Sequence, residues 1–149
     1  MCDLSGANLG KADLRAAGLG GANLTGARLL YSILIGADLT GADLGGADLR
    51  GTNLFYADLS GARLVKADLT GANMVGARLV GADLTDTDLS GANLFRADLS
   101  GAQITRTDLG SASLHDANLT GATLTGARLD RAVLCRTRMP DGTVADDGC

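Results

Sequence analysis

The sequence predicts an all-β solenoid, in which short extended segments wind into a four-sided tube around a column of leucines. Two observations lead to this prediction. An apolar residue recurs every five positions from 4 to 139, giving 28 repeats without an insertion or deletion, and 25 of these residues are leucine. The repeats also resemble each other at a spacing of 20, so that glycine occupies every twentieth position from 21 to 121. Repetition at a fixed period is typical of solenoids, whose repeats stack on their neighbours.

The five-residue period also predicts which side chains face inward. In an α-helix, five steps would leave successive leucines about 140° apart, and no buried stripe would form. A continuous strand fails as well, because five is odd and successive leucines would point to opposite faces. The period fits short segments in which the leucine and the small residue two positions before it face inward, while the residue between them faces outward. Glycine stands two positions after the leucine in 15 of 28 repeats, where a type II turn needs a positive φ.

The repeated motif also identifies a family. The pattern A(D/N)LXX covers about 140 of the 149 residues, as in GADLTGADLGGADLR at residues 36–50, and resembles the pentapeptide-repeat proteins. That resemblance implies a right-handed quadrilateral β-helix over residues 1–140, with seven coils of four pentapeptides, followed by a C-terminal tail or cap at 141–149. Known members include DNA mimics that bind gyrase, proteins of unclear role and secreted effectors, so the resemblance implies a fold more firmly than a function.

The composition argues against an enzyme, and we expect neither a cofactor nor a metal. His115 is the single histidine, glutamate is absent, and no nucleophile is clustered with a base. No segment of about 20 apolar residues is present to span a membrane. The repeat begins by Asp3, which leaves no room for a signal peptide and favours the cytoplasm. The basic residues are scattered and balanced by aspartate, so direct nucleic-acid binding is not expected.

The first candidate site is a column of apolar side chains at outward positions, which His115 and Cys135 continue. At the 20-residue period the column contains Ile35, Phe55, Val75 and Phe95, and Tyr31, Ile33 and Tyr56 widen it. An apolar patch of this kind predicts a face that binds another protein or a second copy of the chain, as a homodimer. The alternative is a ladder that only stiffens the stack through contacts between neighbouring coils.

The second candidate site is a column of aspartates on the preceding face. It contains Asp48, Asp68, Asp88 and Asp108, while Asp38, Asp58 and Asp98 lie on another face. Like charges about 4.8 Å apart repel, unless hydrogen bonds or cations relieve them. Such rows predict the alternative function, a DNA mimic that binds DNA gyrase or another topoisomerase. Against it, Arg28, Arg50 and Arg128 share the face and reduce its field.

The three cysteines allow more than one arrangement. Cys2 occupies the inward small-residue position of the first repeat and is expected to be buried. The tail begins with the turn signal Pro140, Asp141 and Gly142, and we expect it to fold over the last coil. Cys135 and Cys149 could then form a disulfide, or remain thiols in a reducing cytoplasm.

Overall fold

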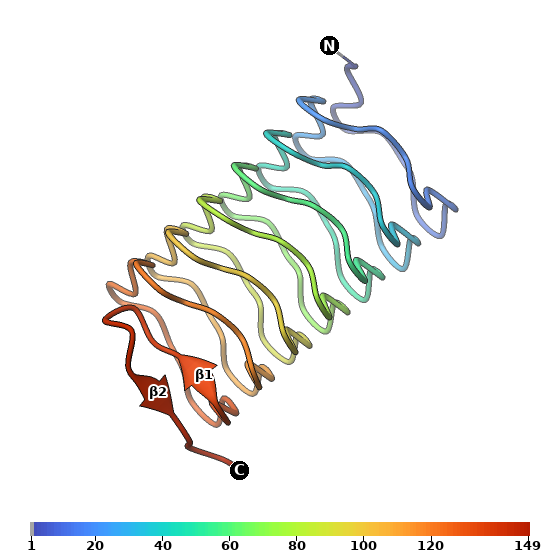
Figure 1. Cartoon of the computed structure of the whole chain (residues 1–149). Coiled ribbons are helices and arrows are strands. Elements are labelled where there is room, and N and C mark those ends of the chain that lie inside the picture. Colours follow the sequence, from blue (N-terminus) through green and yellow to red (C-terminus); the bar gives the residue numbers. More distant parts are fainter. Residues whose placement is uncertain (1) are drawn as a thin grey trace.

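The chain forms one elongated stack of coils, with its two ends at opposite ends of the stack (Figure 1). The computed structural model describes residues 2–149. Isolated parallel bridges join outward residues 20 positions apart, from Asp3 and Asn23 to Asn118 and Arg138. They form four ladders, one along each side of the coil, at the spacing that the sequence predicts. Among the described residues, no helix has the length and apolar character that a membrane crossing would need.

Backbone hydrogen bonds between neighbouring coils hold the stack together. The Leu24 N–H donates to the Asp43 carbonyl at 2.7 Å, and the Asp43 N–H donates to the Ala22 carbonyl at 2.9 Å. A further bond joins the Gly26 N–H to the Gly45 carbonyl at 2.9 Å. Because the same three bonds recur through the stack, each short segment is paired on both sides although it is too short to form a regular strand.

Every corner of the stack uses a left-handed backbone conformation. A turn hydrogen bond joins the Ala27 N–H to the Leu24 carbonyl at 3.0 Å, and Gly26 between them has φ 62°. This geometry is that of the predicted type II turn. Fifteen corner glycines share it, and so do twelve residues with side chains, Tyr31 and Tyr56 among them. The pairing between coils therefore imposes this conformation even where the residue disfavours it.

The core is a column of leucine and alanine that is closed in the middle and open at both ends. The central apolar residues from position 24 to position 119 have no exposed surface, whereas Leu4, Leu9 and Leu14 are half-buried. The expectation for Cys2 is wrong, because its side chain is exposed. The first described coil has a neighbour on one side only, so an inward position there is not covered.

Threonine replaces alanine at four inward positions without leaving a polar group unpaired. The Thr52 hydroxyl donates to the Leu29 carbonyl of the preceding coil at 2.8 Å. The hydroxyls of Thr87, Thr107 and Thr137 make the same bond to a leucine carbonyl. A buried hydroxyl is accepted in an apolar core when it has such a partner.

The last residues lie against the final coil. Strand β1 (Thr137–Arg138) pairs in antiparallel fashion with β2 (Val144–Ala145), so that Thr137 lies opposite Ala145. Cys135 and Cys149 form a disulfide with their Cα atoms 4.9 Å apart. The sequence left this pairing open, and in the structure the two cysteines are bonded.

Shortening a leucine in the middle of the stack should destabilise the protein more than the same change near its first coil. Leu69→Ala removes a fully buried side chain and should lower the free energy of unfolding by about 2–5 kcal/mol. Leu9→Ala should cost less, because Leu9 is only half-buried and leaves a smaller cavity. Urea unfolding followed by circular dichroism measures both, and equal losses would contradict a core that is closed only in the middle.

Candidate functional site

One side of the solenoid differs from the other three because its outward ladder residues carry no charge from position 33 onward, although Asp13 of the first coil begins the same ladder and pairs with Arg15. Its bridge ladder runs through Ile33, Asn53, Asn73, Asn93, Ser113 and Val133. The corresponding positions on the other sides include Arg63, Asp68 and Arg78, among several more charged residues. We call this ladder, together with the neighbouring corner residues Ile35, Phe55, Val75 and Phe95, the uncharged face.

The structure brings the predicted apolar column together along one edge of this face. The Gly36 N–H donates to the Phe55 carbonyl, and the Gly76 N–H to the Phe95 carbonyl, each at 2.9 Å. These bonds keep the column in register from coil to coil. Its members are more covered than the sequence suggests, since Phe55 is 37% exposed and the other three are half-buried. Contact between neighbours at the spacing of adjacent coils accounts for this burial.

The most exposed aromatic side chains belong to the two tyrosines, at about 60% each. Each ring lies over the corner glycine of the next coil. A Cβ atom at Gly51 would come within 2.5 Å of the Tyr31 ring, and one at Gly76 within 2.6 Å of the Tyr56 ring. The edge of the Tyr56 ring also packs on Phe55, with centroids 4.4 Å apart. Both tyrosines have a positive φ, which costs a side chain about 1–2 kcal/mol relative to glycine.

The apolar column ends in a cluster of polar and charged residues that we did not predict. The Arg96 guanidinium lies 4.9 Å from the centre of the Phe95 ring, and His115 packs edge-on against the same ring. Arg136 donates to both carboxylate oxygens of Asp116 and lies 2.8 Å from His115 Nε2. The hydrogen bond from Arg136 lowers the pKa of Asp116. His115 is therefore held between an aromatic ring and an ion pair, not beside a nucleophile.

This cluster could have been found from the 20-residue spacing alone. Arg96, Asp116 and Arg136 occupy the same corner in consecutive coils, as do Asp86 and Arg106 at another corner. Arg106 donates to Asp86 at 2.6 Å, in the same geometry. Two of the corner columns thus place opposite charges next to each other in consecutive coils.

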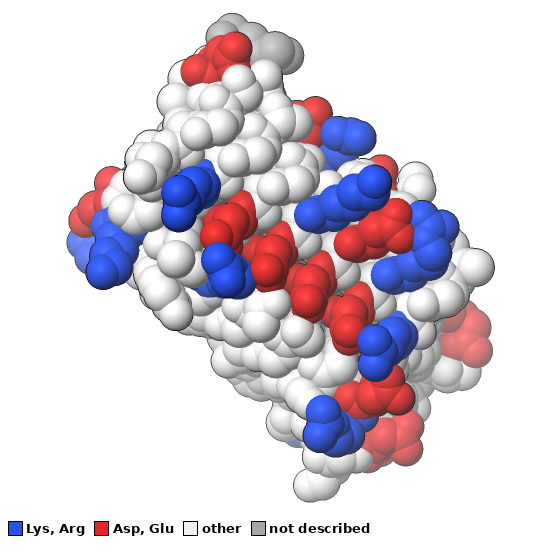
Figure 2. Space-filling model, turned by 180° about the vertical axis from the view of Figure 1, so that it is seen from behind, with Lys and Arg blue, Asp and Glu red and all other residues white. Residues whose placement is uncertain are grey.

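The aspartate column lies in register, but its charge is partly neutralised. Bridges join Asp48 to Asp68, Asp68 to Asp88 and Asp88 to Asp108. Figure 2 shows a row of acidic side chains along the stack, with basic side chains beside it. Arg50 pairs with Asp48 at 2.7 Å and with Asp68 at 3.6 Å, and its hydrogen bond lowers the pKa of Asp48.

Local bonds from the backbone N–H two residues later engage one carboxylate oxygen of each aspartate in this column. Asp88 accepts the Ser90 N–H at 2.8 Å, and Asp108 accepts the Gly110 N–H at the same distance. Asp108 also pairs with Arg128 at 3.3 Å. On the other aspartate ladder, Arg78 lies between Asp58 and Asp98 and pairs with Asp58 at 3.5 Å. The aspartates therefore stabilise the turns that follow them, as well as giving the surface its charge.

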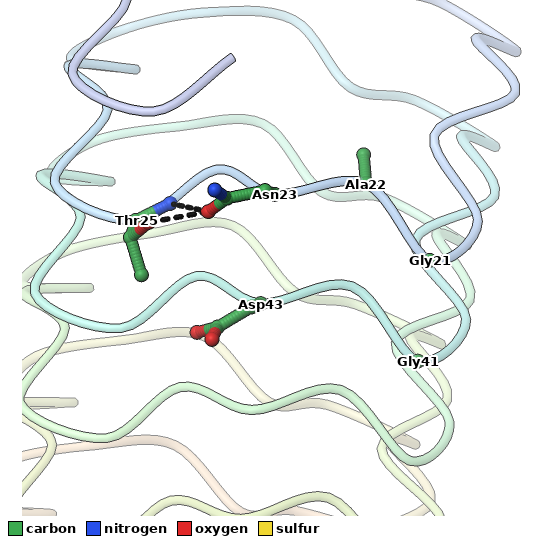
Figure 3. A pocket seen from close by; sticks show the side chains of 6 residues that line it. All are labelled: Gly21, Ala22, Asn23, Thr25, Gly41 and Asp43. Atoms are coloured by element: carbon green, nitrogen blue, oxygen red, sulfur yellow. Dashed lines mark hydrogen bonds between the residues drawn. The ribbon is translucent and has the colours of Figure 1, made fainter. Parts of the chain in front are cut away.

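A shallow pocket lies on a different side, where two corner glycines leave space between adjacent coils (Figure 3). It measures about 320 Å³ and is lined by Gly21, Ala22, Asn23, Thr25, Gly41 and Asp43. Its polar groups are already engaged, since Asn23 accepts the Thr25 N–H at 3.1 Å and Asp43 pairs with Arg63 at 3.2 Å. Within residues 2–149, no group of three or more His, Cys, Asp or Glu side chains is arranged to hold a metal.

The geometry defines a class, the parallel β-solenoids with four-sided coils. The family model for pentapeptide repeats matches eight copies, at residues 2–30, 32–71, 72–110 and 112–141. The chain belongs to the pentapeptide repeat family, whose solved members imply a right-handed quadrilateral β-helix.

Solved structures agree with this membership. The chain is 34% identical to HetL, a pentapeptide repeat protein involved in heterocyst differentiation regulation in the cyanobacterium Nostoc. The match covers 96% of this chain and 78% of HetL, with a TM-score of 0.50. It is 35% identical to a pentapeptide repeat protein of the Arabidopsis thaliana thylakoid lumen, covering 72% of each chain with a TM-score of 0.65. QnrB1, a plasmid-mediated fluoroquinolone resistance protein, is only 16% identical to this chain. That match covers 93% of this chain and 79% of QnrB1, with a TM-score of 0.49. No curated protein matches the chain significantly.

Replacing a corner glycine should be more damaging where a tyrosine covers it. Gly71 and Gly76 both have φ 65°, but space is open beside Gly71 and Tyr56 lies beside Gly76. Gly71→Ala should therefore cost only the left-handed alanine, about 1–2 kcal/mol, whereas Gly76→Ala should cost more and displace the ring. Unfolding free energies measure the difference, and adding Tyr56→Ala to each variant should remove it. Equal costs for the two glycines would show that the ring does not rest on Gly76.

Proposed function

We propose that this protein is a non-catalytic interaction module that binds another protein, or a second copy of itself, through the uncharged face. The observation that carries the proposal is the exposure of Tyr31, Phe55 and Tyr56 around a ladder whose outward residues have no charge from Ile33 to Val133. At 20 residues per coil, the repeats amount to the seven coils of four pentapeptides that the sequence predicts. The proposed face extends along most of this length.

The composition of the face supports a protein partner. Protein interfaces are enriched in tyrosine and phenylalanine at their centres and depleted of aspartate, glutamate and lysine. Asparagines occupy the middle of the face, and Asn73 donates to Asn53 at 3.2 Å, so polar groups there have partners within the ladder. A partner that covers these side chains would leave few charges without solvent, and the desolvation cost would be low.

The exposed tyrosines argue against a purely structural role for the patch. A ladder that only stiffened the stack would gain from rings that are covered by their neighbours. Tyr31 and Tyr56 instead keep about 60% of their surface in solvent at corners where glycine would be easier to accommodate. This exposed apolar surface supports a binding role, whereas the positive φ does not distinguish the tyrosines, because ten other corner side chains share it.

Charging the apolar column should abolish binding without unfolding the protein. In the double variant Phe55→Asp and Phe95→Asp, binding of a partner captured by the wild type should weaken at least about tenfold, because aromatic residues dominate interface energies. The control variant Val65→Asp and Val80→Asp changes residues at the same position after a leucine, half-buried and on other columns. Light scattering reports self-association and an affinity pull-down reports a foreign partner, while thermal unfolding checks the fold. The proposal is wrong if the Phe55 and Phe95 variant binds the partner as well as the control variant does, or if both variants lose it equally.

A second candidate function rests on the in-register aspartate column, which runs through four consecutive coils. In this function, the protein would act as a DNA mimic that occupies the DNA-binding surface of gyrase or a related topoisomerase. Arg50 and Arg128 weaken the resemblance to a row of phosphates, because they pair with three of its four members.

A supercoiling assay tests this second function. If it holds, the protein should inhibit or protect gyrase, and Asp68→Asn with Asp88→Asn should abolish the effect by removing two charges from the column. Asp43→Asn with Asp83→Asn is the matched control, because it removes the same charge from another ladder. No effect of the wild type at a large excess over gyrase would rule out the mimic.

A further inference from the structure

The disulfide joins the last coil to a segment that is otherwise held by hydrogen bonds with little apolar burial. We call residues 141–149 the closing segment. Cys135 is 8% exposed and lies at the end of the apolar column, whereas Cys149 is exposed. The two are 14 positions apart in the sequence, so the bond closes a loop that contains the whole closing segment.

Besides the disulfide, the antiparallel pairing of β2 with β1 and a few further hydrogen bonds hold the closing segment in place. The Leu134 N–H donates to the Asp147 carbonyl and the Met139 N–H to the Thr143 carbonyl, both at 2.8 Å. The Arg136 N–H donates to the Asp146 carboxylate at 3.2 Å. Apart from Ala145, all residues of the segment are exposed, so little apolar burial supports these bonds.

The path of the segment brings its end directly over the last coil. Gly148 has φ 86°, and a Cβ atom there would lie 3.4 Å from Val133. Glycine at this point adopts without strain the positive φ that leads the chain to Cys149, which is bonded to Cys135. The segment thus covers the strand edge of residues 133–139, including β1, and the disulfide fixes it there.

We propose that the Cys135–Cys149 bond is a thiol–disulfide exchange site, and that a dithiol reductant releases the closing segment from the edge of the last coil. This inference is independent of the proposed interaction face. With the disulfide formed, the closing segment covers the edge of the last coil. With the disulfide reduced, the segment is released from that edge.

The difference in exposure between the two cysteine residues indicates how the exchange proceeds, because Cys149 is the more accessible. A thiolate of the reductant attacks the exposed Cys149 Sγ, the disulfide breaks, and Cys135 leaves as a thiolate that takes a proton from water. The second thiol of the reductant then attacks the mixed disulfide, releasing Cys149 as a thiolate. The protein gains two electrons and two protons as thiols, and the dithiol becomes a disulfide.

Release would change the surface of the molecule as well as its redox state. Once the segment leaves, the N–H groups of Leu134, Arg136 and Met139 lose their acceptors. The half-buried side chains of Val133 and Leu134 lose their cover. An edge with unpaired donors can accept an extended strand from another chain, which the oxidised protein prevents by pairing it internally.

Hydrogen exchange on the native protein tests this inference. Adding dithiothreitol should accelerate exchange of the Leu134 and Met139 amides by about 100-fold, the effect expected when a cross-link over a loop of this size is removed. The Leu109 and Leu114 amides, which bond within the stack to Arg128 and Val133, should not change. Alkylation of the folded protein should label one cysteine before reduction, the free Cys2, and three afterwards.

Two variants make the result specific to the disulfide. Cys149→Ser should show the fast exchange with or without reductant, whereas Cys2→Ser should retain the response because Cys2 is free. Unchanged exchange at Leu134 and Met139 after complete reduction would overturn the proposal, since the segment would then be held by its hydrogen bonds alone. Three reactive thiols in the untreated protein, or a disulfide that resists the dithiol until the protein unfolds, would overturn it as well.

Discussion

The hydrogen bonds between coils are the constraint on which the other features of the structure depend. From Leu4 to Leu119, each inward leucine N–H bonds to the carbonyl of an outward residue 19 positions later, as Leu44 does to Arg63 at 2.7 Å. This register forces outward side chains to lie above one another in columns, and it forces each corner into the left-handed conformation. The inward positions are then left for small and apolar residues, and the surface is the part of the sequence that can vary.

The periodic part of the chain could be predicted from the sequence because every repeat has the same length. Inward and outward positions, corners and columns all follow from counting in fives and twenties, and the apolar and aspartate columns lie together as expected. Features that depend on neighbours rather than on period were harder to predict. The exposure of Cys2 follows from its place in the first described coil, and the contact between Tyr56 and Gly76 depends on a ring orientation. The path of the closing segment lies beyond the repeat, so the sequence could not decide between thiols and a disulfide.

The corners show how the fold accommodates residues that suit them poorly. Glycine is the least strained residue at these positions, yet twelve side-chain residues occupy them. Asp86 with Arg106, and Asp116 with Arg136, offset the strain with ion pairs between neighbouring coils. At Tyr31 and Tyr56, contacts between the ring and the corner glycine of the next coil offset the strain, and no ion pair is involved. In each case the compensation comes from the residue 20 positions later, so two corners of the same column must be considered together.

The distribution of charge favours a protein-binding face over a mimic of DNA. A convincing mimic would present a row of uncompensated negative charges, because electrostatic attraction to a basic groove depends on net charge along the row. Here Arg50 and Arg128 pair with members of the aspartate column, and arginines interrupt or flank the other acidic ladders. The residues of the uncharged face form no ion pairs that binding would disturb, and the two tyrosines beside the face lie largely in solvent. Covering it removes apolar surface from water without breaking an ion pair, whereas covering the aspartate column would place arginines against a basic partner.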